Sequence, residues 1–569
     1  VAMARPPIVE TFPSREENEF LVLIRPGMVY NFRGVANVKC IAGHVVISRA
    51  VLSEVKPTAP GLSISAPWRM SQPLNIVCAP KPSELTSYRL KHRIHEVSPA
   101  ADVIMKTMEQ LQAPAAVLLI HILPSTAASL ARFICEDLFV APYHGQVLPY
   151  ALCTIYLPEV PPTLYTPTSR KAIEEASLKM ISSLDGTGRV CCIVTGVKNS
   201  GKSTFLRFLI NDLLSCDNDA QLYWMDTDVG QSEFTPSGCI SFTLVDKPIL
   251  DPPFLHQKSH FKDAMFYGDL SPKYDVDRFN RMFDALFERF VTSTTSRSIL
   301  FINTMGWLEE EGLEILNHIV VHTAPTFVFH VSSDNSVKYR LPREVERTTK
   351  MLQVVWGSNA SSSCSPPGEK PISAALHRDL SLLGYFSPLI SDSCPTISAF
   401  SSAVPFRIPL DELTLCLPDK LSSIPDRCVL ASLNMQLLAL CAFDKQDAKA
   451  VKRRRLLESD KLPYFFVSEE QHPPLRIVGF GILRGVDLEK RQLYLLTPVP
   501  LEQMKEVKCM ARGANCVLPS FILQMQNHSA MPYVMQTSVT QRISVRPSQI
   551  YEEFRNISGF KRAHRKPNH

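Results

Sequence analysis

The chain has 569 residues, a net charge of +5, 45% hydrophobic residues and 20% charged residues, which is typical of a soluble globular protein with about three or four domains. Its mild charge does not by itself indicate a nucleic-acid partner, and no apolar run is long enough to cross a membrane. The fifteen cysteines include no Cys-x-x-Cys pair, and the N-terminus lacks a signal-peptide profile, so a zinc ribbon is excluded and a reducing compartment is favoured.

Residues 1–180 are predicted to form a β-rich N-terminal domain. Short runs of strand-forming residues, such as 20–24 and 44–48, are separated there by glycine and proline.

Residues 181–400 are predicted to form an α/β domain with a parallel sheet, because apolar strand-like runs alternate there with helical segments. The expected strands cover 190–195, 221–225, 299–303 and 326–331, and the expected helices cover 203–214, 276–292 and 313–322. In such a sheet the ligand site lies at the carboxyl ends of the strands.

A phosphate-binding loop is predicted after the first of these strands. The stretch fits Gly-x-x-x-x-Gly-Lys-Ser/Thr and comprises Gly196, Val197, Lys198, Asn199, Ser200, Gly201, Lys202 and Ser203. Its glycines let backbone N–H groups point at phosphate oxygens, while Lys202 reaches the β- and γ-phosphates and Ser203 reaches Mg²⁺. The loop therefore predicts binding of a nucleoside triphosphate, and an ordinary glycine turn is the alternative.

Two carboxylates follow the next predicted strand. Asp226 and Asp228 stand where P-loop proteins keep their magnesium-binding and catalytic acids. One such aspartate can hold Mg²⁺ through water, and the other can accept a proton from an attacking hydroxyl. A pair of turn-capping aspartates is the alternative.

A turn with a tryptophan follows the third predicted strand, at 304–307. Trp307 could stack on a base or clamp the triphosphate, although a place in the core is the commoner use of tryptophan. The chain has no Asn-Lys-x-Asp motif and no combined His-Arg-Asp and Asp-Phe-Gly set, which argues against a guanine-reading GTPase and a protein kinase. These patterns leave the phosphate acceptor open.

Residues 401–569 are predicted to form a C-terminal domain with β-strands, for example at 477–483 and 492–496. The preceding segment, 358–371, has the composition of a mobile loop or insert. Two basic clusters, 452–455 and 561–566, fit a nuclear address or an RNA-contacting patch, and a solvated charge run fits them equally well.

Three stretches, together with the phosphate loop, carry a resemblance to one family. They are Asp-Thr-Asp-Val-Gly-Gln-Ser-Glu-Phe-Thr-Pro-Ser-Gly at 226–238, Thr-Met-Gly-Trp at 304–307 and Gly-Phe-Gly-Ile-Leu-Arg-Gly-Val-Asp at 479–487. They closely resemble the nucleolar polynucleotide 5′-hydroxyl kinases of pre-ribosomal RNA processing, relatives of the RNA kinase of tRNA splicing and pre-mRNA cleavage. Ser237 departs from the pattern, because many relatives have a second proline there.

The resemblance implies a central P-loop domain, flanked by β-rich domains, that uses ATP and Mg²⁺ to phosphorylate the 5′-hydroxyl end of RNA. Family members act beside a Las1-type endonuclease, which cuts internal transcribed spacer 2 of the pre-rRNA and leaves that hydroxyl. A nuclear, nucleolar location, partners among pre-60S ribosomal particle factors and a role in large-subunit maturation are implied as well.

The resemblance also implies roles for individual residues. Lys202 neutralises the β- and γ-phosphates, Ser203 ligates Mg²⁺ and Thr204 supports the phosphates. Asp228 is the general base, and Asp226 is an acid on the metal side.

Further residues match the family around the substrate. Thr304, Gly306 and Trp307 match a clasp that closes around phosphates, and Gln231 helps to orient the metal or the acceptor. Arg378 is the best candidate for a lid arginine that neutralises the migrating phosphoryl group, with an ordinary surface arginine as the alternative. The segment 268–272 fits either an RNA contact or a structural turn.

Two functions of different classes remain. The first is the RNA 5′-kinase, and the second is an ATP-binding assembly subunit of an RNA-processing complex with negligible turnover. The intact Lys202, Ser203 and Asp228 argue against the second. A small-metabolite kinase would leave the flanking domains and basic clusters without a role.

Overall fold

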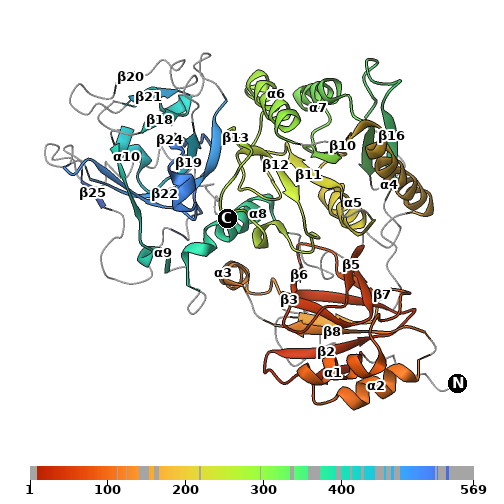
Figure 1. Ribbon diagram of the computed structural model, residues 1–569. Coiled ribbons are helices and arrows are strands. Elements are labelled where there is room, and N and C mark those ends of the chain that lie inside the picture. Colours follow the sequence, from red (N-terminus) through yellow and green to blue (C-terminus); the bar gives the residue numbers. More distant parts are fainter. Residues whose placement is uncertain are drawn as a thin grey trace, which may run out of the picture. The chain divides into compact units, whose positions relative to one another are not determined.

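The computed structural model describes residues 9–111, 113–122, 125–139, 153–158, 166–216, 219–294, 297–332, 339–355, 372–391, 399–410, 413–424, 429–442, 454–455, 463–466, 474–487, 489–519, 522 and 534–536. The chain divides into two compact units. Figure 1 shows the helices and strands, coloured along the sequence. The first comprises 1–258, 271–387 and 391–396, and the second comprises 259–270, 388–390 and 397–569.

The first unit begins with an antiparallel sheet in the order β1-β2-β8-β3-β7-β4-β5, with β6 and β9 paired to β3. Its elements are β1 (Thr11–Pro13), β2 (Glu19–Ile24), β3 (Val29–Ala42), β4 (His44–Ile47), β5 (Ala50–Ser53), β6 (Leu62–Ala66), β7 (Leu74–Cys78), α1 (Ser87–Val97), α2 (Ala101–Glu109), β8 (Ala116–His121), α3 (Thr126–Ile134) and β9 (Cys153–Tyr156). The predicted β-rich character of this region is confirmed.

Both faces of this sheet are buried, and strand β2 shows how its sequence achieves this. Leu21 and Leu23 point into a cluster formed with helices α1 and α2. Phe20, Val22 and Ile24 point into a second cluster on the opposite face. Successive side chains of a strand alternate between faces, so an uninterrupted apolar run fills two cores.

The first unit also contains a parallel sheet in the order β11-β14-β10-β15-β16, which confirms the predicted α/β architecture. Its elements are α4 (Pro167–Thr187), β10 (Arg189–Thr195), α5 (Lys202–Cys216), β11 (Gln221–Asp226), β12 (Cys239–Val245), η1 (Pro253–Leu255), α6 (Val276–Ser293), β14 (Ser298–Asn303), α7 (Glu310–Thr323), β15 (Phe327–Ser332), β16 (Lys350–Val355) and α8 (Ala374–Phe386). Strand β12, which the sequence pattern did not predict, pairs antiparallel with β11.

Helices cover both faces of the parallel sheet. Helices α4 and α5 contribute to one buried cluster with alternate residues of the strands, among them Trp224 of β11. On the opposite face, Tyr223 of β11 meets Phe290 of α6, with ring centroids 5.3 Å apart. Helix α7 lies beside α6. Strands covered on both faces read as continuous apolar runs, as β14 does.

Helix α8 packs against α3 and against η1. The Ser373 hydroxyl accepts a hydrogen bond from Leu376 N and caps the helix. Leu380 of α8 and Phe254 of η1 belong to the buried cluster that Phe20 enters. Gly384 lies directly against the backbone carbonyl of Phe254, where a Cβ atom would collide with it.

The second unit is rich in β-strands, as predicted. Its elements are β13 (Ala264–Phe266), α9 (Ala399–Ser402), β17 (Phe406–Pro409), β18 (Thr414–Leu417), α10 (Val429–Leu433), β19 (Leu437–Ala442), β20 (Arg454–Arg455), β21 (Pro463–Phe466), β22 (Arg476–Asp487), β23 (Gln492–Leu496), α12 (Leu501–Met504), β24 (Val507–Arg512) and β25 (Val534–Gln536). The glycine-rich stretch 479–487 lies in β22, which pairs with β13, β19, β23 and β25.

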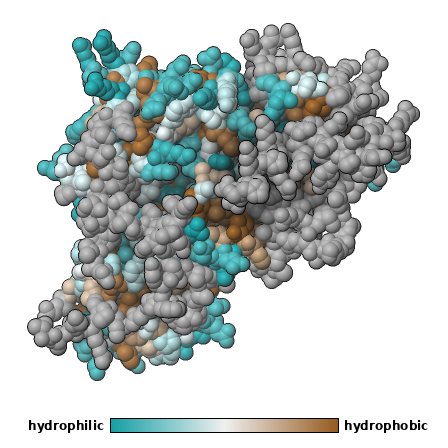
Figure 2. Space-filling model, turned by 180° about the vertical axis from the view of Figure 1, so that it is seen from behind, coloured by the Kyte–Doolittle hydropathy of each residue, from teal (hydrophilic) through white to brown (hydrophobic). Residues whose placement is uncertain are grey.

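Among the described residues, no helix has both the length and the apolar character that a membrane span requires. Figure 2 shows hydrophilic residues over much of the described surface on one face, with hydrophobic residues in separate patches.

Candidate functional site

The candidate site lies at the carboxyl ends of three neighbouring parallel strands. The register aligns Val194 of β10 and Asp226 of β11 with Asn303 of β14, the strand between them. The three connections that follow these strands therefore begin at the same edge of the sheet, where open α/β sheets bind their ligands.

The phosphate loop adopts a conformation that depends on its glycines. Gly196 and Gly201 have φ of 152° and 88°, and Asn199 has φ of 61°. Side chains other than glycine and asparagine rarely adopt such values. A Cβ atom on Gly196 would also collide with the Val331 carbonyl oxygen. Sequence and packing thus both require glycine where the loop leaves β10.

Lys202, the first residue of α5, is buried and folds back over the loop. Its Nζ donates hydrogen bonds to the carbonyl oxygens of Gly196, at 3.0 Å, and Val197, at 3.1 Å. Burial lowers the pKa of Lys202 to about 8, although the nearby charge of Asp228 acts in the opposite direction. The ammonium group is therefore held inside the loop and is easier to deprotonate than an ordinary lysine.

The remaining loop residues differ in exposure. Ser200 is buried, Val197 and Ser203 are half-buried, and Lys198, Asn199 and Thr204 are exposed. Ser203 and Thr204 lie in the first turn of α5, so their hydroxyls are at the positive end of that helix.

Asp226 is buried at the end of β11, and hydrogen bonds occupy both of its carboxylate oxygens. Oδ2 accepts from Glu233 N at 2.7 Å, and Oδ1 accepts from Asn303 Nδ2 at 3.0 Å. The net pKa of Asp226 is about 8. Burial raises it most, and the nearby charge of Asp228 also raises it, whereas these two hydrogen bonds lower it.

Asp228 caps the turn that follows β11. Its Oδ1 accepts hydrogen bonds from the backbone N–H groups of Gly230, at 2.9 Å, and Gln231, at 3.2 Å. Desolvation raises the pKa of Asp228, and these backbone hydrogen bonds together with the charge of Lys202 oppose the shift. The side chain of Gln231 is exposed. The turn-capping alternative therefore describes part of what Asp228 does.

The turn after β14 contacts the phosphate loop directly. A Cβ atom on Gly306 would come within 2.6 Å of both N and Cα of Lys198 and 3.1 Å from Lys202 Nζ. The Thr304 hydroxyl is buried and donates to the Val194 carbonyl oxygen at 2.9 Å, which ties β14 to β10.

Trp307 is half-buried, and its indole lies against the first turn of α7. A Cβ atom on Gly312 would collide with the indole ring, so this glycine makes room for the tryptophan. Trp307 is therefore neither a core residue nor a freely exposed one.

The structure does not bring Arg378 into hydrogen-bonding contact with the phosphate loop within the described residues. Arg378 is half-buried on α8, between His377 and Asp379. Burial lowers the pKa of His377, and the charges of Arg207 and Arg378 lower it further. The beginning of α8 thus lies near Arg207, a residue of α5 that follows the phosphate loop by about one helical turn.

A buried ion-pair network beside the site was not predicted from the sequence. Glu233 is 3% exposed, and its carboxylate receives hydrogen bonds from Arg207 Nε at 2.7 Å and Arg207 Nη2 at 2.9 Å. His256 Nε2 lies 3.1 Å from Glu233 Oε1. Burial alone would raise the pKa of Glu233, but Arg207 and His256 lower it to about 2. Asn303 was also missed, although its place at the end of a predicted strand could have indicated it.

The segment 268–272 begins as a turn within the second unit. Gly268 has φ of 81°, and its carbonyl oxygen accepts from Ala514 N at 2.7 Å. Asp269 accepts hydrogen bonds from Asn515 Nδ2 at 2.8 and 3.0 Å. These contacts favour the structural-turn alternative. The predicted insert 358–371, residues 452–453, the side chains of 454–455 and the basic tail 561–566 lie outside what the structure describes.

Comparisons with known proteins agree with this geometry. Residues 196–387 match the family model "mRNA cleavage and polyadenylation factor CLP1 P-loop", and residues 401–518 match "NOL9-like, C-terminal domain". The chain is 31% identical to polynucleotide 5′-hydroxyl-kinase nol-9 of Caenorhabditis briggsae, over 89% of this chain and 90% of that protein. It is 28% identical to polynucleotide 5′-hydroxyl-kinase NOL9 of Homo sapiens, over 65% of this chain and 55% of that protein.

A solved structure supports the fold. The chain resembles Clp1p in a wild-type complex with Pcf11p, with a TM-score of 0.51 and 14% identity, over 89% of this chain and 100% of that one. At this level of identity the likeness concerns the fold alone.

Proposed function

Because this chain belongs to the polynucleotide 5′-hydroxyl kinase family of the nol-9 type, we propose that it transfers the γ-phosphoryl group of ATP to the 5′-hydroxyl end of RNA. The observation that carries the proposal is that a phosphate loop with Lys202 and the carboxylate of Asp228 lie at the same edge of the sheet. We assign the reaction to the predicted domain 181–400, between the predicted domains 1–180 and 401–569.

In this proposal the phosphate loop binds the triphosphate of ATP. The backbone N–H groups between Gly196 and Ser203, with the positive end of α5, attract the phosphate oxygens. Lys202 exchanges its hydrogen bonds with the loop carbonyls for contacts with the β- and γ-phosphates. The turn that contains Thr304, Gly306 and Trp307 packs against the loop beside Lys198 and Lys202.

The donor atoms around the loop suit Mg²⁺, which prefers oxygen ligands and keeps several waters. The Ser203 hydroxyl would bind the ion directly. Asp226 would hold it through water, because Glu233 N and Asn303 Nδ2 already occupy its two oxygens. The ion would neutralise negative charge on the β- and γ-phosphate oxygens. Gln231, exposed on the turn after Asp228, would orient the ion or the acceptor.

Asp228 serves as the general base of the proposed reaction. As the ribose 5′-oxygen attacks the γ-phosphorus, its proton passes to Asp228. The new P–O bond forms while the bond from the γ-phosphorus to the bridging oxygen of ADP breaks. Desolvation raises the pKa of Asp228 toward the working pH, which makes the carboxylate a stronger base than an exposed aspartate.

Arg378 remains the proposed lid arginine, which would neutralise charge on the migrating phosphoryl group. Its helix, α8, begins near Arg207 of α5. Reaching the γ-phosphate then requires α8 or the Arg378 side chain to move when substrates bind.

The biological setting is proposed from the family. We assign the kinase to processing of internal transcribed spacer 2 during large ribosomal subunit maturation, in the nucleolus of the nucleus. A Las1-type endonuclease would supply the 5′-hydroxyl RNA, and pre-60S particle factors would be further partners.

The test is to incubate the purified chain, alone and with its nuclease partner, with labelled ATP, Mg²⁺ and a 5′-hydroxyl RNA oligonucleotide. Label on the RNA end that disappears in Lys202→Ala supports the kinase. Measurable ATP binding without any label on RNA, in both settings, would instead favour the assembly subunit without turnover.

A further inference from the structure

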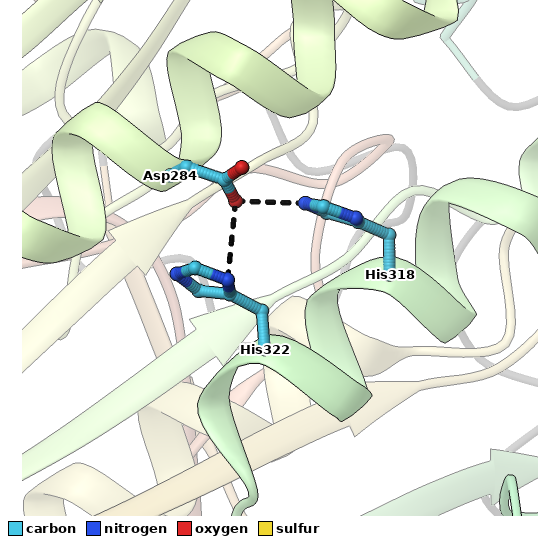
Figure 3. Close-up of side chains that lie close together, drawn as sticks. All are labelled: Asp284, His318 and His322. Carbon is cyan, nitrogen blue, oxygen red and sulfur yellow. Dashed lines mark hydrogen bonds and ion pairs between the residues drawn. The ribbon is translucent and has the colours of Figure 1, made fainter.

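Helices α6 and α7 bring together a carboxylate and two imidazoles away from the phosphate loop. His318 Nε2 lies 2.7 Å from Asp284 Oδ1, and His322 Nδ1 lies 3.5 Å from the same oxygen. Figure 3 shows both rings turned toward this carboxylate across the gap between the helices. The three ligand atoms all lie within 4.8 Å of one another.

The cluster is accessible from solvent. The side chains of Asp284, His318 and His322 are 36%, 31% and 38% exposed. An ion could therefore enter without unfolding of either helix, and an open coordination position would face water.

The packing of the two helices fixes the orientation of the imidazoles. His318 and His322 are four residues apart on α7, and their rings stack with centroids 5.7 Å apart and an angle of 17°. Phe283 of α6 meets both rings edge-on, with centroids 6.4 and 6.1 Å away. Because Phe283 is itself in the core, it restricts how far the two rings can turn before any ligand arrives.

These three donors match the needs of a transition metal. Ligand atoms around a tetrahedral zinc ion are separated by about 3.4 Å, since Zn–N and Zn–O bonds are about 2.0–2.2 Å long. Small side-chain rotations would bring the observed 2.7 and 3.5 Å separations to that value. Two imidazoles with one carboxylate suit Zn²⁺ and its neighbours, whereas Mg²⁺ and Ca²⁺ prefer oxygen ligands.

A simple Asp–His hydrogen bond between helices explains only part of this arrangement. It accounts for His318, but not for the second imidazole, whose Nδ1 faces the same oxygen instead of solvent. His322 also lies in the last turn of α7, where the helix dipole favours a positive charge.

We propose that Asp284, His318 and His322 form a binding site for a divalent transition metal of the zinc class, which ties α6 to α7. The site is separate from the proposed kinase chemistry. Metal bound there stabilises the folded protein, because the unfolded chain does not hold the three ligands together.

The test uses the full chain after treatment with a chelator. Zinc binding is measured by competition with a chromogenic chelator and by the rise in Tm on addition of Zn²⁺. The variants are Asp284→Asn and His322→Gln. His92→Gln is the matched control, because His92 is exposed and lies 3.2 Å from Glu96 but belongs to no cluster of three potential ligands among the described residues. Circular dichroism without zinc verifies that each variant folds.

The expected result is that wild type and His92→Gln bind one more equivalent of Zn²⁺ than Asp284→Asn and His322→Gln, or bind it at least ~10-fold more tightly. The comparison between variants is the readout, because free cysteines such as the exposed Cys216 also bind zinc. Equal zinc binding and equal Tm shifts in all four proteins would overturn the proposal.

Discussion

Gly306 lies so close to Lys198 that a Cβ atom on the glycine would come within 2.6 Å of both N and Cα of that residue. The turn after β14 and the phosphate loop are therefore in backbone contact. The turn cannot move toward the loop without displacing it.

Gly306→Ala should displace the phosphate loop, because backbone atoms cannot yield as a flexible side chain does. A displacement of about 1 Å at a reacting group can cost about 10²-fold in rate, so we expect a loss of that order in kcat/KM for ATP. Gly27→Ala is the control, since no atom lies within 4 Å of its Cβ position and its φ of 73° makes alanine costly only to stability. Unchanged kinetics in Gly306→Ala would show that the loop tolerates the contact.

Lys202 should take up a proton when ATP binds at pH 8. Its pKa of about 8 leaves about half of the amino groups neutral at that pH, and the phosphate charge favours the protonated form. Calorimetry in two buffers of different ionisation enthalpy measures this uptake. Lys202→Arg should show none, because its guanidinium stays charged. If the binding enthalpy of ATP depended on the buffer equally in the wild type and in Lys202→Arg, the proton could not be taken up by Lys202.

Asp228→Asn should lose activity without loss of fold. The asparagine Oδ1 can still accept from Gly230 N and Gln231 N, but it cannot take the proton of the ribose hydroxyl. We expect kcat to fall about 10²–10⁴-fold, while the exposed carboxylate variant Asp246→Asn stays near wild type. In the wild type, the pH dependence of kcat/KM on the acid side should report a pKa above the ordinary aspartate value of 3.8, because desolvation raises the pKa of Asp228.

Asp226→Asn should change how stability depends on pH. In the wild type without Mg²⁺ the folded carboxyl keeps its proton up to about pH 8, whereas the unfolded one loses it near 3.8. Between these two pKa values the folded state binds more protons than the unfolded state. The contribution of Asp226 to stability therefore falls as the pH rises. The variant should lack this slope in Tm between pH 5 and about 8. The new side-chain amide can still pair with Asn303. Asn303 Oδ1 is buried without a hydrogen-bond partner, and it can accept a hydrogen bond from the new amide if the Asn303 side-chain amide flips.

Glu233→Gln should destabilise the first unit by about 3–5 kcal/mol at pH 7, because Arg207 would lose its buried anionic partner. The folded pKa of about 2 lies below the ordinary 4.5, so the contribution of Glu233 is present above pH 4.5 and is lost as the pH approaches 2. Urea unfolding at pH 7 and at low pH measures both effects. Glu84→Gln, which removes an exposed pair with Lys81, should be nearly neutral.

Local patterns predicted the parallel strands β10, β11, β14 and β15, the phosphate loop and the two aspartates, because apolar runs and glycine spacing act over short stretches. They did not predict β12, which pairs with β11, or β16, which pairs with β15 at the edge of the parallel sheet. Nor did they show that Glu233 holds Asp226 through its backbone N–H while its side chain binds Arg207. Such relationships join residues that only the folded chain brings together.

The burial of Leu380 of α8 in the core of the N-terminal sheet has a consequence for how this enzyme could be shortened or could diverge. Removal of residues 1–158 would strip the cover from an apolar face of the very helix that carries Arg378. The N-terminal sheet and helix α8 therefore share one hydrophobic core. A relative that has lost the sheet is expected to carry polar residues at the position of Leu380, or to cover that face with a different segment.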